Sequence, residues 1–293
     1  MRLPGPGYPA PAKLNLFLHV TGRRADGYHL LQSVFALVDR CDEVRVRVRE
    51  DGLIRRVNDV PGVAEESDLV VRAARALQSE SGSALGADIE LEKRIPMGAG
   101  LGGGSSDAAT VLMALDALWQ LGLGRKRLQR VGLALGADVP FFVAGQNAWV
   151  EGIGERLTPI EIPALWYVVL VPPVHVATRD VFAAPELTRN HETLKMEDFS
   201  AQPGRFLNDG RFLNDPRPRF GNDLEAVVLP RYPQVRSHLE WLRRFGPARM
   251  TGSGGCVFAG FAARSAAQRV LDALPATMQG FIAQGLTQHP LRA

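Results

Sequence analysis

Five glycines stand within the eleven residues Pro96 to Ser106 (PMGAGLGGGSS), and an apolar stretch rich in Ala, Leu and Val follows at once. Because glycine has no Cβ, this backbone can approach an anion closely and turn successive N–H groups toward it. The apolar stretch predicts a helix, and with Ser105 and Ser106 as N-cap residues its unpaired N–H groups and dipole would favour the same anion. The segment predicts a phosphate-binding loop. A flexible linker is the alternative, but a linker would not run directly into an apolar helix.

Better-known phosphate loops do not fit this segment. A P-loop requires Lys followed by Ser or Thr after its last glycine, whereas Gly104 is followed by Ser105. The glycine loop of protein kinases joins two strands and is accompanied by further signatures that this chain lacks. A dinucleotide fingerprint requires a parallel βαβ unit with an acidic residue about 20 positions on, which the basic stretch from Trp119 to Arg130 does not supply.

Length and composition indicate an ordinary globular protein and exclude several classes. A chain of 293 residues exceeds what one core usually serves, so two domains are expected. Two cysteines, Cys41 and Cys256, without clustered histidines indicate a reducing compartment and no metal site. The N-terminus is interrupted by prolines, and the longest apolar run, 166–174, is too short to span a membrane. We therefore expect a cytoplasmic protein without a membrane partner.

The chain carries a net charge of +3, but its arginines are scattered among acidic residues, so no nucleic-acid partner is expected. Lysines are rare: Lys13, Lys93, Lys126 and Lys195 are the only four. Lys13 stands in a stretch, Ala12 to Val20 (AKLNLFLHV), whose alternation predicts a strand. One face would carry Leu14, Leu16, Leu18 and Val20, and the other Lys13, Asn15, Phe17 and His19. Lys13 and Asn15 therefore share a face, which lies toward either solvent or a pocket.

Two further segments hold residues suited to a site. A turn at 25–27 leads Tyr28 and His29 into a second apolar strand, and placed opposite Lys13 and Asn15 this pair would line a pocket; a surface position is the alternative. Asp138 follows a helix expected to stop at Gly136 and precedes an apolar stretch, 139–143, expected to be a strand. A carboxylate among such neighbours needs a cation, for which Lys13 is the candidate, unless it caps a local turn.

The remaining patterns predict the scaffold. Alternating Val and Arg at 43–50 are typical of a half-exposed strand with solvated arginines, and Ser67 is expected to cap a helix over 67–79. Further predictions are a strand over 88–93, a helix over 126–135, and two strands around a second glycine turn over 249–261. The repeated RFLND at 205–223 is interpreted as a mobile loop without a function.

The segments PAKLNLFL, GYH, PMGAGLGGGSSDAA, LGADVPFF and MTGSGGCVF follow one another as in a known family. From about Pro11 to about Leu291 the chain resembles the GHMP kinase superfamily, and within it the kinases of 4-diphosphocytidyl-2-C-methyl-D-erythritol. The resemblance implies an α+β GHMP kinase fold. Residues 1–155 would form an ATP-binding domain like ribosomal protein S5 domain 2, and residues 156–293 a ferredoxin-like substrate domain. It also implies transfer of the ATP γ-phosphoryl group to the substrate's 2-hydroxyl, with Mg²⁺ accompanying ATP.

The resemblance carries site residues over to this chain. Lys13 matches the family's catalytic lysine and Asp138 its base, as phosphoryl transfer needs. Asn15, Tyr28 and His29 match positions near the substrate, and Phe182 matches an aromatic that stacks on cytosine. The nucleotide loop comprises Pro96, Met97, Gly98, Ala99, Gly100, Leu101, Gly102, Gly103, Gly104, Ser105 and Ser106, and the third motif comprises Thr251, Gly252, Ser253, Gly254 and Gly255.

Departures and rival functions stay open at this point. Asp68 stands where relatives often carry Asn, near the adenine side, and the RFLND repeat precedes the family's NDLE at 222–225. Rival readings are a kinase of homoserine or mevalonate, a nucleotide-binding regulator without catalysis, and an RNA-binding module. The GYH and PAKLNL segments argue against a homoserine or mevalonate kinase. The presence of both Lys13 and Asp138 argues against a regulator without catalysis, and the lack of aromatics among clustered basic residues argues against an RNA-binding module. The expected partner is a small-molecule substrate, and the chain is a monomer or a homodimer.

Overall fold

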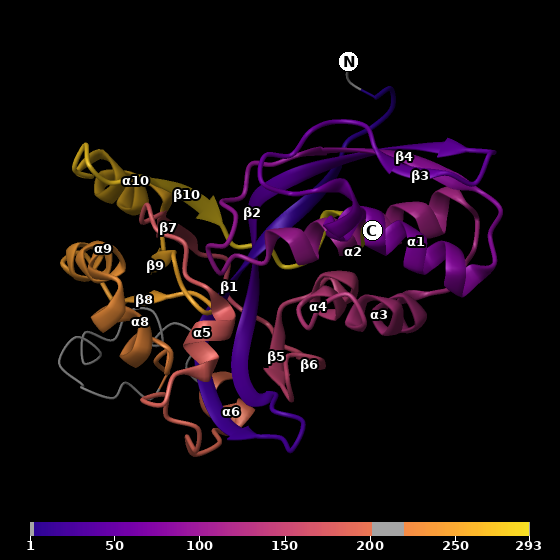
Figure 1. The fold of residues 1–293 in the computed structure, drawn as a ribbon. Helices are drawn as coiled ribbons and strands as arrows, with labels where there is room; N and C mark the ends of the chain where they lie inside the picture. Colours follow the sequence, from indigo (N-terminus) through magenta and orange to yellow (C-terminus); the bar gives the residue numbers. More distant parts are fainter. Residues whose placement is uncertain (1–2, 201–219, 293) are drawn as a thin grey trace.

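Two β-sheets organise the chain, one built by residues 8–159 and the other by residues 166–284, as Figure 1 shows. The computed structural model describes residues 3–200 and 220–292. The combination of helices with two sheets confirms the α+β class. Within those two ranges, no helix has both the length and the apolar character needed to cross a membrane. The RFLND repeats at 205–209 and 211–215 lie outside the described residues.

The first sheet has six strands in the order β3-β4-β2-β5-β6, and β1 pairs with β2 off this path. Helices α1 and α2 pack against it, α3 and α4 pack on these two helices, and all four share one large apolar cluster with the sheet (Figure 1). The expected division at residue 155/156 stays a prediction, and β6 pairs with β5 in this sheet. The elements are β1 Tyr8–Arg23, β2 His29–Arg49, β3 Ile54–Arg56, α1 Leu69–Ser81, β4 Gly86–Glu92, α2 Gly103–Leu118, α3 Arg125–Leu133, α4 Val139–Ala144, β5 Ala148–Glu151 and β6 Arg156–Pro159.

The β1–β2 hairpin is longer than its sequence pattern predicts. β2 is a single strand of 21 residues that includes both predicted strands, and β1 pairs with residues 29–44 of it. The pairing is irregular between Asn15 and Leu18. As a result Leu18 lines the cavity together with Lys13 and Asn15, while Phe17 joins the apolar cluster of Leu14 and its neighbours. The predicted alternation is therefore wrong beyond Asn15, because an irregularity of this kind reverses the two faces.

Two predicted helix caps differ in the structure. Asp68, not Ser67, is the N-cap of α1: its side chain accepts a hydrogen bond from the backbone N–H of Val70, and 65–67 form a short 3₁₀ turn. Helix α2 begins at Gly103, with Gly102 as its N-cap in the left-handed conformation. Ser105 and Ser106 consequently lie inside the first turn. Glycine replaces serine as the cap because only a residue without a Cβ adopts φ = +72° without strain.

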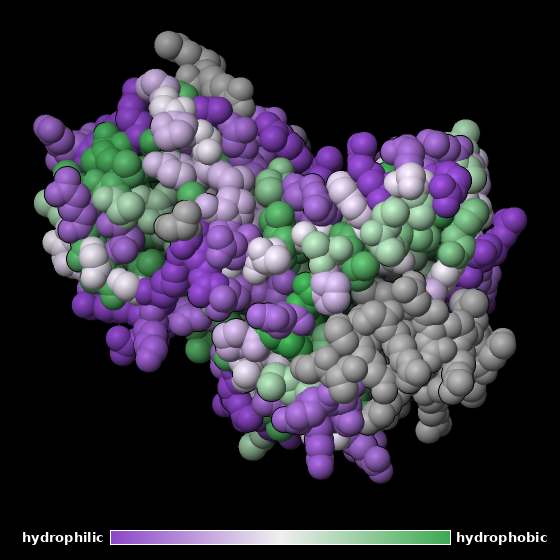
Figure 2. Space-filling view, turned by 180° about the vertical axis from the view of Figure 1, so that it is seen from behind, coloured by the Kyte–Doolittle hydropathy of each residue, from purple (hydrophilic) through white to green (hydrophobic). Residues whose placement is uncertain are grey.

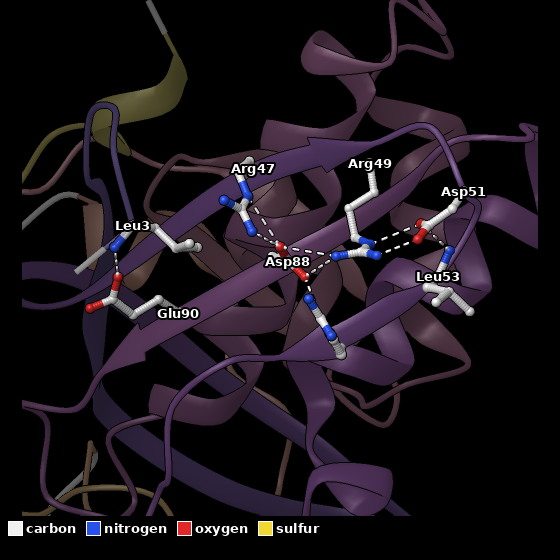
Figure 3. A network of polar contacts seen from close by, with 8 residues as sticks. Leu3, Arg47, Arg49, Asp51, Leu53, Asp88 and Glu90 are labelled. Atoms are coloured by element: carbon white, nitrogen blue, oxygen red, sulfur yellow. Dashed lines mark hydrogen bonds and ion pairs between the residues drawn. The ribbon is translucent and has the colours of Figure 1, made fainter. Parts of the chain in front are cut away.

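The arginines of β2 are not all solvated, contrary to the prediction from their alternation. Asp88 on β4 is fully buried, and Arg47 and Arg49 of β2 reach its carboxylate, as Figure 3 shows. Arg49 is only 18% exposed, whereas Arg47 is about half exposed as predicted, and Arg55 of β3 also pairs with Asp88. Arg49 also pairs with Asp51. Burial alone would raise the pKa of Asp88, but hydrogen bonds from Arg55, Arg47 and Arg49 lower it to about 2. This network ties β2, β3 and β4 together at one edge of the sheet.

The second sheet is antiparallel, in the order β10-β7-β9-β8. The predicted strands on either side of the second glycine turn are β8 and β9. Beyond β10 the chain returns to the first sheet: the N–H of Leu286 donates to Leu37 and that of His289 to Gly145. The surface dips between the two lobes of the molecule (Figure 2). The elements are β7 Trp166–Leu170, α5 Thr178–Ala183, α6 Met196–Ser200, α8 Glu225–Arg231, α9 Pro233–Arg243, β8 Ala248–Met250, β9 Val257–Phe261, α10 Arg264–Asp272, β10 Gly280–Gln284 and a 3₁₀ turn Pro290–Arg292.

Candidate active site

A cavity of about 680 Å³ is lined by residues from both halves of the chain. The first half contributes β1, the glycine-rich loop and the turn before α4, and the second half contributes residues around α5 and the second glycine turn. Of the predicted site residues, it is lined by Lys13, Asn15, Pro96, Met97, Gly98, Ala99, Gly100, Leu101, Gly102, Gly103, Gly104, Ser105, Asp138, Phe182, Gly252 and Ser253.

The glycine-rich loop has the backbone that the sequence predicts for an anion-binding loop. Gly98, Gly100 and Gly102 have φ angles of +64°, +77° and +72°. Such alternation between left-handed and ordinary residues turns neighbouring N–H groups toward one side, which is how backbone nests hold anions. Ser105 also lines the cavity from the first turn of α2. Ser106 is fully buried, and its hydroxyl has no hydrogen-bond partner among the described residues.

The second glycine turn packs directly on the first loop. A Cβ on Gly100 would lie 2.3 Å from the carbonyl oxygen of Thr251, and one on Gly252 would lie 3.0 Å from that of Gly100. The N–H of Cys256 donates to the carbonyl of Ala99 over 3.2 Å. Glycines in both loops thus permit backbone-to-backbone contact between segments more than 150 residues apart in the chain. Gly254 and Gly255 serve this turn, with φ angles of +109° and +95°, and do not line the cavity.

Lys13 lines the cavity beside Asp138. Its Nζ is 3.5 Å from Oδ2 of Asp138, it donates to Oδ1 of Asn15, and it lies 4.5 Å from the centre of the Phe35 ring. The Lys13 side chain is 4% exposed, whereas that of Asp138 is 30% exposed. The predicted ion pair is therefore present, with the cation buried and the carboxylate open to the cavity.

Asp138 owes its position to helix α4. Val139 to Ala144 form this helix, so the predicted strand after Asp138 is wrong; Pro140 in its first turn suits a helix start, and Gly145 ends it with φ = +68°. Asp138 is the residue before the helix, but its side chain makes no capping hydrogen bond. The alternative prediction, that the Asp138 side chain caps a local turn, is therefore wrong.

Asn15 joins three segments at the cavity wall. Its backbone N–H donates to Oγ1 of Thr251 over 2.9 Å, and its side-chain amide donates to Oγ of Ser33 over 3.1 Å. The carbonyl oxygen of that amide accepts from Lys13. Thr251 is fully buried and acts on the site through Asn15 rather than by lining the cavity.

Sequence reasoning missed a buried charge cluster behind the glycine loop. Lys93 lies 2.7 Å from Asp107 and also pairs with Asp42; Lys93 and Asp107 line the cavity. Burial raises the pKa of Asp107 well above its ordinary value, and burial alone would lower that of Lys93, but Asp107 and Asp42 raise it. Asp42 accepts from the N–H groups of Arg94 and Ile95, so this cluster fixes the start of the loop. The scarcity of lysines was the one available signal.

Asp68 lines the cavity with its carboxylate already engaged. Arg56, which is also buried, donates from Nη1 to Oδ2 of Asp68, while Oδ1 caps helix α1 through Val70. Asp68, which stands where relatives often carry Asn, therefore has Arg56 of β3 as its partner. The sequence spacing of Arg56 and Asp68 did not predict this pair.

Tyr28 and His29 do not lie opposite Lys13 and Asn15. The pairing of β1 with β2 sets Leu37 against Lys13 and Phe35 against Asn15, because the hairpin turn lies some ten residues further along β1. Tyr28 is 60% exposed, and neither it nor His29 lines the cavity.

His29 nevertheless lies close to a residue that does line the cavity. Its ring centre is 5.1 Å from that of Phe182, and its Nε2 accepts a hydrogen bond from Nε of Arg189. Two of the predicted substrate residues, His29 and Phe182, are thus brought together at one end of the cavity.

The sequence matches two family descriptions, GHMP kinases N terminal domain over residues 68–146 and GHMP kinases C terminal over residues 208–280. Similar proteins named 4-diphosphocytidyl-2-C-methyl-D-erythritol kinase occur in several bacteria. That of Thiobacillus denitrificans is 60% identical and covers 97% of this chain and 96% of its own length. The corresponding values are 56%, 97% and 92% for Nitrosospira multiformis, and 52%, 97% and 94% for Aromatoleum aromaticum.

Solved structures agree with the sequence comparison. A crystal structure of 4-(cytidine 5'-diphospho)-2C-methyl-D-erythritol kinase superposes with a TM-score of 0.81 at 34% identity, covering 96% of this chain and 99% of that one. A homoserine kinase of Cytophaga hutchinsonii gives 0.69 at 18% identity, covering 99% and 97%, and a mevalonate kinase gives 0.68 at 14%, covering 97% and 100%. These last two show the fold alone. The GHMP kinase fold expected from the sequence is confirmed.

Proposed function

The chain belongs to the 4-diphosphocytidyl-2-C-methyl-D-erythritol kinase family of the GHMP kinases, and on this premise we propose how its cavity performs the family's reaction. The reaction transfers the γ-phosphoryl group of ATP to the 2-hydroxyl of 4-diphosphocytidyl-2-C-methyl-D-erythritol and gives the 2-phosphate and ADP. It is a step of the methylerythritol phosphate route to isoprenoid precursors. The observation that carries our proposal is the Lys13–Asp138 pair, which faces one cavity together with both glycine loops.

We assign the ATP phosphates to the glycine-rich loop and the first turn of α2. The left-handed glycines at 98, 100 and 102 turn backbone N–H groups together, and the N-terminus of a 16-residue helix follows at Gly103. The hydroxyl of Ser105 adds a donor at the same place. Lys93 and Asp68, with Arg56 behind it, lie further along the same cavity and are proposed to border the rest of the nucleotide.

Lys13 and Asp138 are proposed to act on the transferred group and on the acceptor hydroxyl. Negative charge is spread over the oxygens of the phosphoryl group in the transition state, and a buried cation with few competing waters stabilises it strongly. The Lys13 ammonium meets this requirement because Asn15 and Asp138 hold it in one place. Asp138, whose carboxylate is the more exposed of the pair, is proposed to accept the proton of the 2-hydroxyl.

The cytidine of the substrate is proposed to bind at the Phe182 end of the cavity. A flat base favours stacking on an aromatic ring with hydrogen bonds at its edge. Phe182 offers the ring, and His29, 5.1 Å from it, offers the edge contact. Asn15 is proposed to contact the erythritol part because it lies beside Lys13. Tyr28, exposed next to His29, would have to move toward the base to contribute.

Mg²⁺ is proposed to arrive with ATP. Magnesium bound to nucleotides usually takes one or two protein oxygens besides the phosphates, and no complete protein cage is required. Within the described ranges, the one group of three His, Cys, Asp or Glu side chains close enough to share an ion lies elsewhere. The oxygens that fit are the partly exposed carboxylate of Asp138 and the Ser105 hydroxyl, which both line the cavity. When bound, the ion would neutralise phosphate charge.

The test is a comparison of acceptors. Purified protein is incubated with Mg-ATP and, in parallel, the cytidyl substrate, homoserine or mevalonate, and the release of ADP is followed. The expected result is ADP release with the cytidyl substrate alone, slowed by about 10²-fold or more in the Asp138→Asn variant. Preference for homoserine or mevalonate would refute the assignments at Phe182 and His29. ATP binding without turnover of any of the three acceptors would refute the catalytic proposal as a whole.

A further inference from the structure

Three potential metal ligands meet at a point where β1 contacts two distant segments. His19 lies on β1, His191 follows α5, and Asp223 precedes α8. Ligand atoms of the three residues lie within 4.8 Å of one another. The His19 and His191 rings are stacked, with centres 3.6 Å apart, and Nδ1 of His191 is 2.9 Å from Oδ1 of Asp223. None of the three lines the cavity of the proposed kinase site.

His19 is an unusual buried histidine. It has 0% exposed surface, and neither of its ring nitrogens has a hydrogen-bond partner among the described residues. A buried polar group without a partner is costly, so it calls for an explanation. Phe17 packs 4.9 Å from the ring and offers no acceptor or donor. The His19 ring stacks on the ring of His191, which in turn pairs with Asp223.

We propose that His19, His191 and Asp223 form a binding site for a zinc-like divalent transition-metal ion. Two imidazoles and one carboxylate are typical ligands of Zn²⁺, and imidazole nitrogen favours such ions over Mg²⁺ and Ca²⁺. The sequence predicted no metal site because these residues are separated by 172 and 32 positions and form no short motif. Only the fold brings them together.

The local geometry suits an ion bound between Nδ1 of His191 and Oδ1 of Asp223, in place of the proton of their hydrogen bond. Ligands of a tetrahedral site with bonds of about 2.0 Å lie about 3.3 Å apart, close to the 2.9 Å found between these two side chains. A ring nitrogen of His19 lies within 4.8 Å of the ligand atoms of the other two residues, so the His19 ring would have to rotate out of the stack to bind the same ion. Asp223 keeps its second role, because its Oδ2 accepts from the N–H of Val20 over 2.8 Å.

Solvent reaches the site from one side. His191 is partly exposed and lines a second cavity of about 500 Å³ together with residues 192–195 and Asp198. This cavity gives an ion an entry path and room for a water as the fourth ligand, which open zinc sites usually keep. The bound ion would link β1 to the segments before α6 and before α8, which are otherwise joined there by backbone hydrogen bonds from His191 to Val20 and from Asp223 to Leu18.

The experiment uses the full chain without an affinity tag. Protein is stripped with a chelator and titrated with Zn²⁺ against a chromophoric competitor, and bound metal is counted by atomic emission. Co²⁺ then serves as a probe, since a tetrahedral site gives it a characteristic visible spectrum. The variants are His191→Ala, Asp223→Asn, which keeps an acceptor for Val20, and His19→Phe, which keeps an aromatic ring in the stack. The matched control is His175→Ala, which removes an exposed histidine outside the cluster.

We expect one zinc per chain in the parent protein and in the control. Each cluster variant should bind zinc more than about tenfold more weakly, and zinc should raise the melting temperature of the parent but not of His191→Ala. Failure of the parent to retain zinc would overturn the proposal, as would a zinc affinity equal to that of the parent in all three cluster variants. If His19→Phe does not fold, His191→Ala still decides the matter, since its side chain is partly exposed.

Discussion

Nε of Arg189 donates a hydrogen bond to Nε2 of His29 over 3.0 Å. Arginine has only donors, so this ring nitrogen must be the acceptor, and a neutral His29 then carries its proton on Nδ1. Burial and then the charges of Arg189 and Arg23 lower the pKa of His29, which favours the neutral form. The same guanidinium donates to the carbonyl of Phe182 over 3.1 Å. Arg189 therefore positions both residues proposed to hold the cytidine.

Replacing Arg189 with Met should weaken binding of the cytidyl substrate. Loss of the hydrogen bonds from a charged group to His29 and Phe182 should raise the KM for this substrate about tenfold, corresponding to about 1.4 kcal/mol, while the KM for ATP stays unchanged. Steady-state kinetics with each substrate varied in turn measures both. Arg130→Met, at an exposed position on α3, is the control. An equal rise in both KM values would indicate general damage rather than a positioning role.

Asp138→Asn tests the proposed base. The substitution keeps the size of the side chain and its distance of 3.5 Å from Lys13 but removes the proton acceptor. We expect kcat to fall by about 10²- to 10⁴-fold, with ATP affinity measured by calorimetry within a few-fold of the parent. Glu240→Gln, an exposed carboxylate on α9, should leave both quantities unchanged. A kcat within tenfold of the parent would assign proton removal to another group.

Two glycines of the same loop should respond in opposite ways to alanine. Gly100 has φ = +77°, and an added Cβ would lie 2.3 Å from the carbonyl oxygen of Thr251, so Gly100→Ala should lower the free energy of unfolding by about 2 kcal/mol or more. Gly104 lies in helix α2, and the nearest atom to an added Cβ would be Cδ1 of Leu69, at 3.4 Å. Gly104→Ala should therefore be neutral or stabilising by up to about 1 kcal/mol. Urea unfolding of both variants measures the difference, and equal destabilisation would contradict the backbone contact between the two loops.

Local sequence patterns predicted the parts of the site whose cause is local. The glycine-rich loop, the helix after it and the strand that carries Lys13 follow from spacing and residue type, and the pairing of Lys13 with Asp138 follows from the need of a carboxylate near the core for a cation. Residues 139–143 were predicted as a strand but form a helix. The prediction failed because so short an apolar run fits either structure.

Long-range contacts account for most of what the sequence did not predict. Phe17 and Leu18 exchanged faces because of one irregularity in the β1–β2 pairing, which no local pattern records. Arg49 was expected to be solvated, but its side chain is only 18% exposed and pairs with Asp88 of β4. Tyr28 and His29 were placed opposite Lys13 because the length of the hairpin was unknown. The fold and the glycine-rich motif could be predicted from the sequence, whereas the register of the strands and the partners of the charged side chains could not.

His289 provides a test of how stability depends on pH. The residue is fully buried after β10; its backbone N–H donates to Gly145, its Nδ1 accepts from the N–H of Leu291, and its Nε2 has no partner among the described residues. Burial, with a smaller contribution from the charge of Arg125, lowers its pKa from 6.5 to about 4. The unfolded chain therefore binds more protons than the folded one between these two values, and stability must fall as the pH falls through this window.

His289→Asn removes this titration but keeps an oxygen that can accept from Leu291. Between about pH 7 and pH 5 the parent should lose about 2 kcal/mol more unfolding free energy than the variant, because protonation of His289 favours the unfolded chain there. Urea unfolding at the two pH values gives the difference. A nuclear magnetic resonance titration gives an independent readout, in which the His289 ring signal of the folded protein stays in its neutral position throughout this range. Parallel pH dependence of the two proteins, or a ring signal that titrates near its ordinary pKa, would show that the imidazole is hydrated and that the chain end is not docked against Gly145 in solution.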